Sequence, residues 1–243
     1  MLTAIGALPH LELLDLEEDP EFVPLFGPES STTVELPHGS FPVLQKLVIY
    51  VHKRFELVER IWNIATLVRR LTSVSLCVKP PVDYAQACDL VRNIHQGSPL
   101  VRDLILDFRH IWRHLGLLKT GFAALLSQFP LQRLYFAEQY NIQDGQRCTG
   151  QELALALPNV EHLQLYGYNF TFQDLTFIAA HMPRLETLSI SIKVGADWPS
   201  MDDIPLPSLK PSSSQLLFHF PNSPSISTLS KSKDPSVVER IAV

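Results

Sequence analysis

Six side chains in this sequence are of types suited to binding another molecule: three tyrosines, one arginine and two aspartates that flank them. They are Tyr50, Asp103, Asp107, Arg133, Tyr135 and Tyr166. Tyrosine and arginine are enriched at the energetic centres of protein interfaces, because they offer a large contact area at a low ordering cost. We predict that this set binds a protein partner. The alternative is that exposed tyrosine and arginine are ordinary surface residues on parallel strands.

Catalytic signatures are missing from the sequence, which contains no GxSxG, HExxH, GxxxxGK[ST], GxGxxG or DxDxDG pattern. The closest histidine pair, His110 and His114, has the i, i+4 spacing that binds a metal on a helix. Two ligands without a nearby third are more typical of a solvated face. The three cysteines form no CxxC spacing. We therefore expect no enzyme activity, no metal site and no cofactor.

Charge and hydropathy limit the kinds of partner and the cellular compartment that we expect for this protein. The formal net charge of −5 has the wrong sign for binding nucleic acid through its phosphates, so no nucleic-acid partner is expected. The segment 108–114 combines basic and aromatic residues, a composition that suits binding of nucleic acid or of a phosphorylated partner. A loop between a strand and a helix is the simpler interpretation. No run of about 18 apolar residues occurs, and residues 1–7 lack signal-peptide features. We expect a cytoplasmic or nuclear protein without membrane contact.

The elements that must position the six candidate residues come from an internal repeat. The phrase LxxLxL recurs seven times, and a proline stands one or two residues before six of the seven anchor residues. The anchors are Leu11, Leu44, Leu71, Val101, Leu131, Val160 and Leu185. Steps of 25 to 33 residues between them suit a solenoid, in which similar units stack along one axis.

Each phrase ends in apolar residues that alternate with period two, which predicts one short parallel strand per copy. The apolar residues then face a core, and the positions between them line the concave face of the solenoid. Those positions are Leu13, Asp15 and Glu17; Lys46, Val48 and Tyr50; Ser73, Ser75 and Cys77; Asp103, Ile105 and Asp107; Arg133, Tyr135 and Ala137; His162, Gln164 and Tyr166; Thr187, Ser189 and Ser191. All six candidate residues belong to this set.

Between the strand phrases the apolar spacing becomes three to four residues, which is typical of helices. It predicts helices over about 55–70, 83–95, 117–128, 150–157 and 171–181, the last capped by Thr171 with an acidic third position, Asp174. In the six phrases that have it, the proline ends the helix, because the α region is disfavoured for the residue preceding a proline.

This pattern resembles the leucine-rich repeat family over about residues 8–192. In detail it is similar to the irregular repeats of fungal F-box proteins, in which phrases such as Phe41-Pro42-Val43-Leu44 open each strand. The resemblance implies an α/β solenoid of about seven repeats, with strands on the concave side and helices on the convex side. It also implies substrate recognition for a ubiquitin ligase, with the transfer done by other subunits. No F-box segment is visible, so contact with the ligase scaffold would require a further N-terminal segment.

We predict two parts: a solenoid over 1–192 and a Ser/Pro-rich loop or disordered tail over 193–243. Within the tail, Leu216, Phe218 and Phe220 alternate like the strand of a degraded, truncated eighth repeat. Two other functions stay open. One is a regulator of enzymes, of the inhibitor or GTPase-activating kind, although irregular repeat lengths argue against it. The other is a truncated, non-functional fragment.

Overall fold

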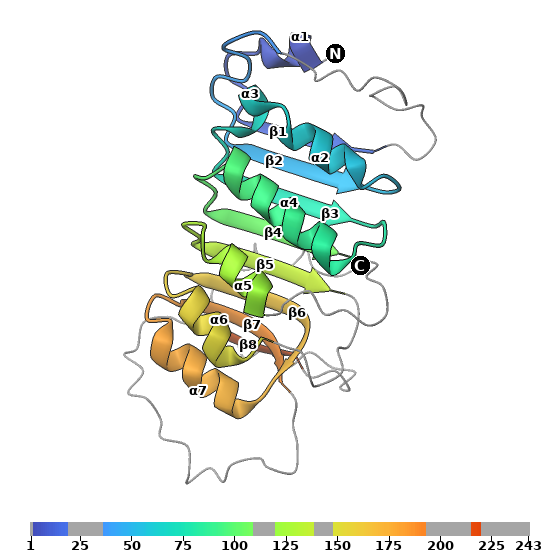
Figure 1. The fold of residues 1–243 in the computed structure, drawn as a ribbon. Coiled ribbons are helices and arrows are strands. Elements are labelled where there is room, and N and C mark those ends of the chain that lie inside the picture. Colours follow the sequence, from blue (N-terminus) through green and yellow to red (C-terminus); the bar gives the residue numbers. More distant parts are fainter. Residues whose placement is uncertain (1, 19–35, 109–119, 139–147, 193–214, 220–243) are drawn as a thin grey trace, which may run out of the picture.

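The computed structural model describes residues 2–18, 36–108, 120–138, 148–192 and 215–219, and its centre is one sheet of eight parallel strands (Figure 1). The strands follow one another in sequence order, so each pairs with the strand of the next repeat. They are β1 (Leu13–Glu17), β2 (Lys46–Val51), β3 (Ser73–Val78), β4 (Asp103–Phe108), β5 (Arg133–Glu138), β6 (His162–Phe170), β7 (Thr187–Ile192) and β8 (Gln215–His219). The seven predicted strands are confirmed, and a strand also forms where the degraded eighth repeat was expected.

A repeated pair of backbone hydrogen bonds between neighbouring repeats fixes the register of the strands. The carbonyl oxygen of the residue just before one strand accepts two backbone N–H bonds from the start of the next repeat. The oxygen of Thr72, for example, accepts from Arg102 at 2.8 Å and from Asp103 at 3.1 Å. Equivalent pairs recur from Glu12 to Glu161. Because these repeats begin their strands with the same pair of bonds, equivalent residues of neighbouring strands lie side by side.

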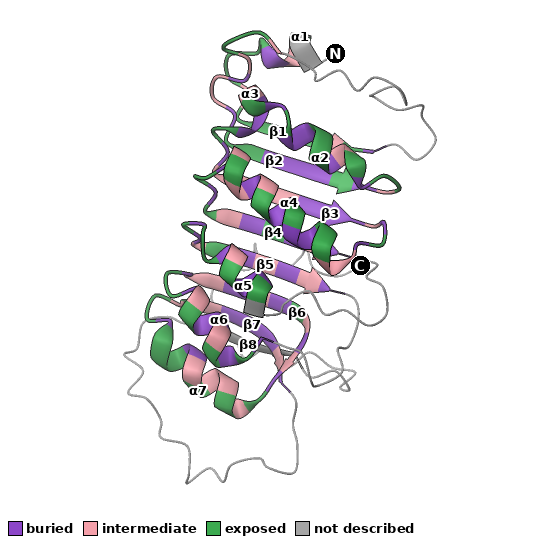
Figure 2. Ribbon diagram, in the orientation of Figure 1, coloured by how far each residue is buried: buried purple, intermediate pink, exposed green. Residues whose placement is uncertain are grey.

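The core forms as the alternation predicts. The second and third apolar residues of the phrases in β2 to β5 are at most 1% exposed, and Phe136 occupies one of these positions on β5. Its ring lies 5.9 Å from the ring of Phe108 and 5.5 Å from that of Phe122. Figure 2 shows buried residues running along the strands under the helices. The solenoid thus has one continuous core between sheet and helices.

The helices lie along one face of the sheet, and no described helix covers the other face (Figure 1). They are α2 (Glu56–Trp62), α3 (Ala65–Val68), α4 (Tyr84–Gly97), α5 (Thr120–Leu126), α6 (Gly150–Ala156) and α7 (Phe172–His181). Three begin with a capping box, and the predicted cap of Thr171 with Asp174 is one of them. In each box the cap side chain and the third helical residue satisfy each other's backbone N–H, which fixes where the helix starts.

The single helix predicted over 55–70 is wrong, because the structure has two short helices there. Asn63 ends α2, and Ile64 adopts the non-helical angles φ −93° and ψ 83° before α3 begins. Ile64 is only 4% exposed, so the break turns its side chain into the core. The helical spacing of apolar residues is preserved across the break, which is why the sequence pattern alone did not show it.

A short helix that the sequence analysis did not predict, α1 (Leu2–Gly6), precedes the first strand. It lies at the β1 end of the sheet (Figure 1). The backbone N–H of Phe41 donates to the carbonyl oxygen of Gly6 at 2.8 Å, and Ile5 packs against the core. This helix therefore covers part of the first repeat.

Candidate functional site

The candidate residues all lie on the sheet face that no described helix covers, called here the open face. It comprises the three alternate positions of each strand from β1 to β7 that point away from the core. Tyr50 and Tyr166 are exposed on it, at 39% and 37%, and the Arg133 side chain is 64% exposed. Asp103, Asp107 and Tyr135 are half-buried. The structure therefore places all six residues on one surface, as the alternation predicts.

Tyr135 on β5 and Tyr166 on β6 form an aromatic pair on this surface. Their ring centroids are 5.4 Å apart, with the planes inclined by 45°. The hydroxyl of Ser189 on β7 donates to that of Tyr166 at 3.5 Å. Aromatic pairs at this distance stabilise each other beyond the area they bury, which holds both rings in place on the face. A partner would meet them as a pre-ordered unit.

Arg133 and Asp103 are opposite each other at the start of β5 and β4. A guanidinium nitrogen of Arg133 lies 3.8 Å from a carboxylate oxygen of Asp103, and the two side chains are 64% and 35% exposed. An exposed pair at this separation stabilises the fold by less than about 1 kcal/mol. Both groups therefore retain most of their capacity to interact with another molecule.

Asp107 occupies the other end of β4, next to Cys77 on β3 and Ala137 on β5. The Cys77 thiol donates to a carboxylate oxygen of Asp107 at 3.6 Å. Tyr166 is the neighbour of Ala137 on the far side. The structure thus lines up a carboxylate, a small residue and an exposed ring across three adjacent strands.

Tyr50 is not part of this cluster. It lies on β2, between Glu17 on β1 and Cys77 on β3. Since adjacent strands are about 4.8 Å apart, β2 is separated from β5 by about 14 Å. The sequence predicts the face on which Tyr50 lies, but it does not bring Tyr50 to the other two tyrosines.

Ile105 belongs with the central tyrosines, although it was not among the six predicted site residues. It is 38% exposed and pairs in register with Tyr135. An exposed isoleucine next to a half-buried aromatic ring adds apolar area to this part of the face. The same alternation that singles out Tyr135 also places Ile105 on this face, so the signal was present in the sequence.

A bulge in β6 sets the position of Tyr166. The register between β6 and β7 shifts between Leu165 and Asn169, so three residues of β6 have no partner on β7. Gly167 has φ +89°, and a Cβ built there would lie 2.0 Å from the carbonyl oxygen of Glu138. Only glycine fits this close approach. Within the bulge, the buried hydroxyl of Tyr168 donates to the Glu138 carboxylate.

A second polar cluster lies at the carboxyl ends of β1 to β3. Glu18, 5% exposed, accepts from the backbone N–H groups of His52, Lys53 and Arg54 at 2.8 to 3.3 Å and from Arg54 Nε at 3.0 Å. Burial acts to raise the pKa of Glu18, but these hydrogen bonds outweigh it and hold the pKa below its ordinary value. Glu18 thereby anchors the loop after β2.

His52 is the centre of the exposed part of this cluster. Its Nε2 lies 3.1 Å from a carboxylate oxygen of Glu17, and its Nδ1 lies 2.9 Å from Lys79 Nζ. A neutral ring that donates from Nε2 and accepts at Nδ1 satisfies both neighbours. These contacts account for the cluster by a structural role: they stabilise the edge of the sheet formed by β1 to β3.

Among the described residues, no three histidine, cysteine, aspartate or glutamate side chains come together as metal ligands. His110, His114 and the rest of the basic-aromatic segment after Phe108 lie outside the described residues. In the described ranges, no helix combines the length and apolar character needed to cross a membrane. Comparison of the chain with known protein families, with curated proteins and with solved structures found no match.

Proposed function

We propose that this chain is a leucine-rich-repeat solenoid that binds a protein partner on its open face and recruits it rather than transforming it chemically. The observation that carries the proposal is the ordered Tyr135–Tyr166 pair, with Arg133 beside it, on a face without a described helix. Large rings held in place lose little side-chain entropy on binding, so they contribute more affinity than mobile side chains of equal area.

The repeat assignment is supported by the agreement of the LxxLxL phrases with strand and core. In β2 to β7 the second and third apolar residues of each phrase are buried, and the positions between them lie on the open face. Each repeat adds one parallel strand, with helices on the other side of the sheet (Figure 1). Solenoids of this kind present a surface assembled from many repeats, which suits an extended protein partner.

The resemblance of the repeat phrases to those of fungal F-box proteins supports the proposal that this recruitment serves a ubiquitin ligase. A protein held on the open face would be presented for ubiquitin transfer, and other subunits would perform the transfer.

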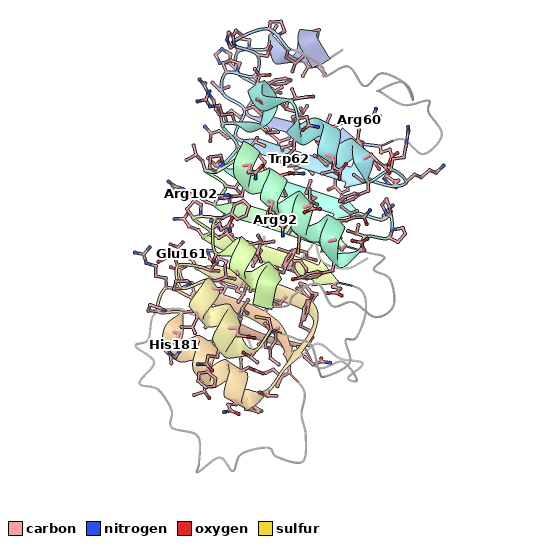
Figure 3. The ribbon with its side chains drawn as sticks, viewed as in Figure 1. Arg60, Trp62, Arg92, Arg102, Glu161 and His181 are labelled. Carbon is pink, nitrogen blue, oxygen red and sulfur yellow. The ribbon has the colours of Figure 1, made fainter. Side chains whose placement is uncertain are left out.

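The test is quantitative affinity purification of the tagged chain from the cytosol of its own cells, comparing three forms. The first is the wild type and the second is R133A/Y135A. The third, R92A/L155A, is a matched control on the helix side, where the Arg92 side chain is 50% and Leu155 60% exposed. Figure 3 views the molecule from this side and labels Arg92 on α4.

We expect R133A/Y135A to lower recovery of the specific partner by about ten-fold or more, because truncating an aromatic or arginine side chain that contributes to an interface costs more than about 1 kcal/mol. Its unfolding free energy should fall by only about 1–2 kcal/mol, since Arg133 is exposed and the half-buried Tyr135 loses mainly its contact with Tyr166. The control should retain the partner. Equal recovery with wild type and R133A/Y135A contradicts binding at the open face.

The ligase context is tested in the same experiment with a form extended upstream where the genomic sequence provides one. Recovery of a cullin scaffold with the extended form alone supports recruitment to a ubiquitin ligase. Recovery of the same partner by both forms, with no scaffold in either, shows a binding module outside the ubiquitin system. Recovery of chaperones alone favours the non-functional fragment.

A further inference from the structure

We propose that the open face binds an arginine side chain of its protein partner over Ala137, between Asp107 and Tyr166. This inference rests on the proposed function and specifies the chemistry that the partner must carry. It follows from the shape of one row of side chains, from two aromatic rings beside it and from the charge of the face.

The row crosses three adjacent strands at their carboxyl ends. Asp107 on β4 is in register with Ala137 on β5, which is in register with Tyr166 on β6. Because neighbouring strands are about 4.8 Å apart, the backbones that carry Asp107 and Tyr166 are about 10 Å apart. The side chain of Ala137 ends at Cβ, while its two neighbours extend further from the sheet. A side chain of the partner that lies over Ala137 therefore contacts a carboxylate on one side and a ring on the other.

Two rings are positioned to contact a cation at this place. Tyr135 precedes Ala137 by two residues on the same face of β5, and its centroid is 5.4 Å from that of Tyr166. The faces of aromatic rings carry partial negative charge and attract a cation within about 6 Å, and arginine is found there more often than lysine. Both rings retain access to a partner, since Tyr166 is 37% exposed and Tyr135 is half-buried.

The charge of the described open face also favours a basic group. Its acidic residues are Asp15, Glu17, Asp103 and Asp107, and its basic residues are Lys46 and Arg133. Four carboxylates and two basic side chains give the open face a formal charge of −2. Arg133 lies against Asp103, at the opposite end of the strands from Asp107. At the rim, Lys79 contacts His52.

Arginine fits this arrangement better than lysine. Its guanidinium is planar, so it can stack on a tyrosine ring and donate two parallel hydrogen bonds to a carboxylate at the same time. A carboxylate offers about four acceptor positions, so one that already has hydrogen-bond partners, as Asp107 has, can still accept from a guanidinium. A lysine ammonium supplies the charge but not the flat surface.

The test is NMR of the full chain with ring-labelled tyrosine, titrated with three pools of seven-residue peptides. The pools share randomised flanks and carry a fixed central arginine, citrulline or lysine. Citrulline has nearly the shape of arginine without its charge. We expect the arginine pool to shift the Tyr135 and Tyr166 resonances saturably, with a dissociation constant about ten-fold lower than that of the citrulline pool, because charge-assisted hydrogen bonds are about twice as strong as neutral ones. The lysine pool should fall between them.

Two carboxylate variants locate the effect. Asp107→Asn should weaken binding of the arginine pool by about ten-fold. Asp15→Asn is the matched control, since it removes an equal charge from the same face three strands away. It should change the dissociation constant of the arginine pool by less than about two-fold, because exposed charges at that distance are largely screened by salt.

Four results would overturn the assignment. They are the absence of tyrosine shifts, equal affinity for the arginine and citrulline pools, equal affinity for the arginine and lysine pools, and equal losses in the two aspartate variants. These failures are distinct from failure of the proposed function. If R133A/Y135A loses its protein partner but the arginine pool shows no preference, binding at the open face stands and the arginine site does not.

Discussion

Replacement of Glu18 by glutamine tests how a single buried carboxylate anchors the β1–β3 edge. Glu18 is 5% exposed and accepts three backbone N–H bonds and one bond from Arg54 Nε. Glutamine has nearly the same shape but carries no charge, and its NH₂ group can only donate. One of its two terminal atoms therefore faces a donor, and the bonds that persist become neutral.

The expected loss of unfolding free energy is about 2–4 kcal/mol. Hydrogen bonds to a charged group contribute about 1.5–3 kcal/mol each, against about 1 kcal/mol for neutral ones, and a buried donor left unpaired costs a further 1–3 kcal/mol. The Arg54 side chain is 46% exposed, so water replaces part of its interaction with Glu18. The three backbone N–H groups therefore account for most of the effect.

The assay is urea unfolding followed by circular dichroism, together with hydrogen exchange at the His52, Lys53 and Arg54 amides. Because a solenoid is stabilised by neighbouring repeats, the first repeat can open locally, and exchange at these amides reports that opening directly. Glu17→Gln is the control, since the Glu17 side chain is 69% exposed and it contacts His52 at 3.1 Å. We expect it to cost less than about 0.5 kcal/mol.

The pH dependence gives a second check with a defined sign. The pKa of Glu18 in the folded chain is below its ordinary value of 4.5, so its contribution is fully present above pH 4.5 and is lost as the pH falls through the folded pKa. The stability difference between wild type and Glu18→Gln should therefore shrink below pH 4.5. Equal stability and equal amide exchange for the Glu17 and Glu18 variants at pH 7 would refute the anchoring role.

Two further predictions concern the bulge and the buried thiol. Gly167→Ala should lower the unfolding free energy in urea by about 3 kcal/mol or more, because its Cβ would lie 2.0 Å from the Glu138 carbonyl oxygen. Gly39→Ala, also at φ +89° but with open space around it, should lower it by only about 1–2 kcal/mol, and equal losses would contradict the clash. Burial, together with the charges of Glu152 and Asp174, raises the pKa of Cys148 from 9.0 to about 12. In a C77S/C88S variant at pH 8, the Cys148 thiol of the folded chain should therefore react with a thiol reagent about a thousand-fold more slowly than that of the chain unfolded in urea. Comparable rates in the two states would show that Cys148 is accessible.

Much of the fold could be predicted from the sequence because its determinants are local. The period-two alternation in phrases such as Leu131, Leu134 and Phe136 fixes both the strand and the side that faces the core. The same alternation places Tyr135 and Ile105 on the open face. The break at Ile64 could not be predicted, because it leaves the helical spacing of buried residues unchanged while the backbone departs from the helix.

The sequence by itself determined the repeats, the strands and the face on which each candidate residue lies. Only the tertiary structure decided which of these residues meet. It paired Tyr135 with Tyr166 and left Tyr50 about 14 Å away, because neighbours on the face are set by strand order and register rather than by residue type. The bulge at Gly167 and the burial of Glu18 likewise arise from contacts between residues about 30 positions apart, which no local pattern encodes.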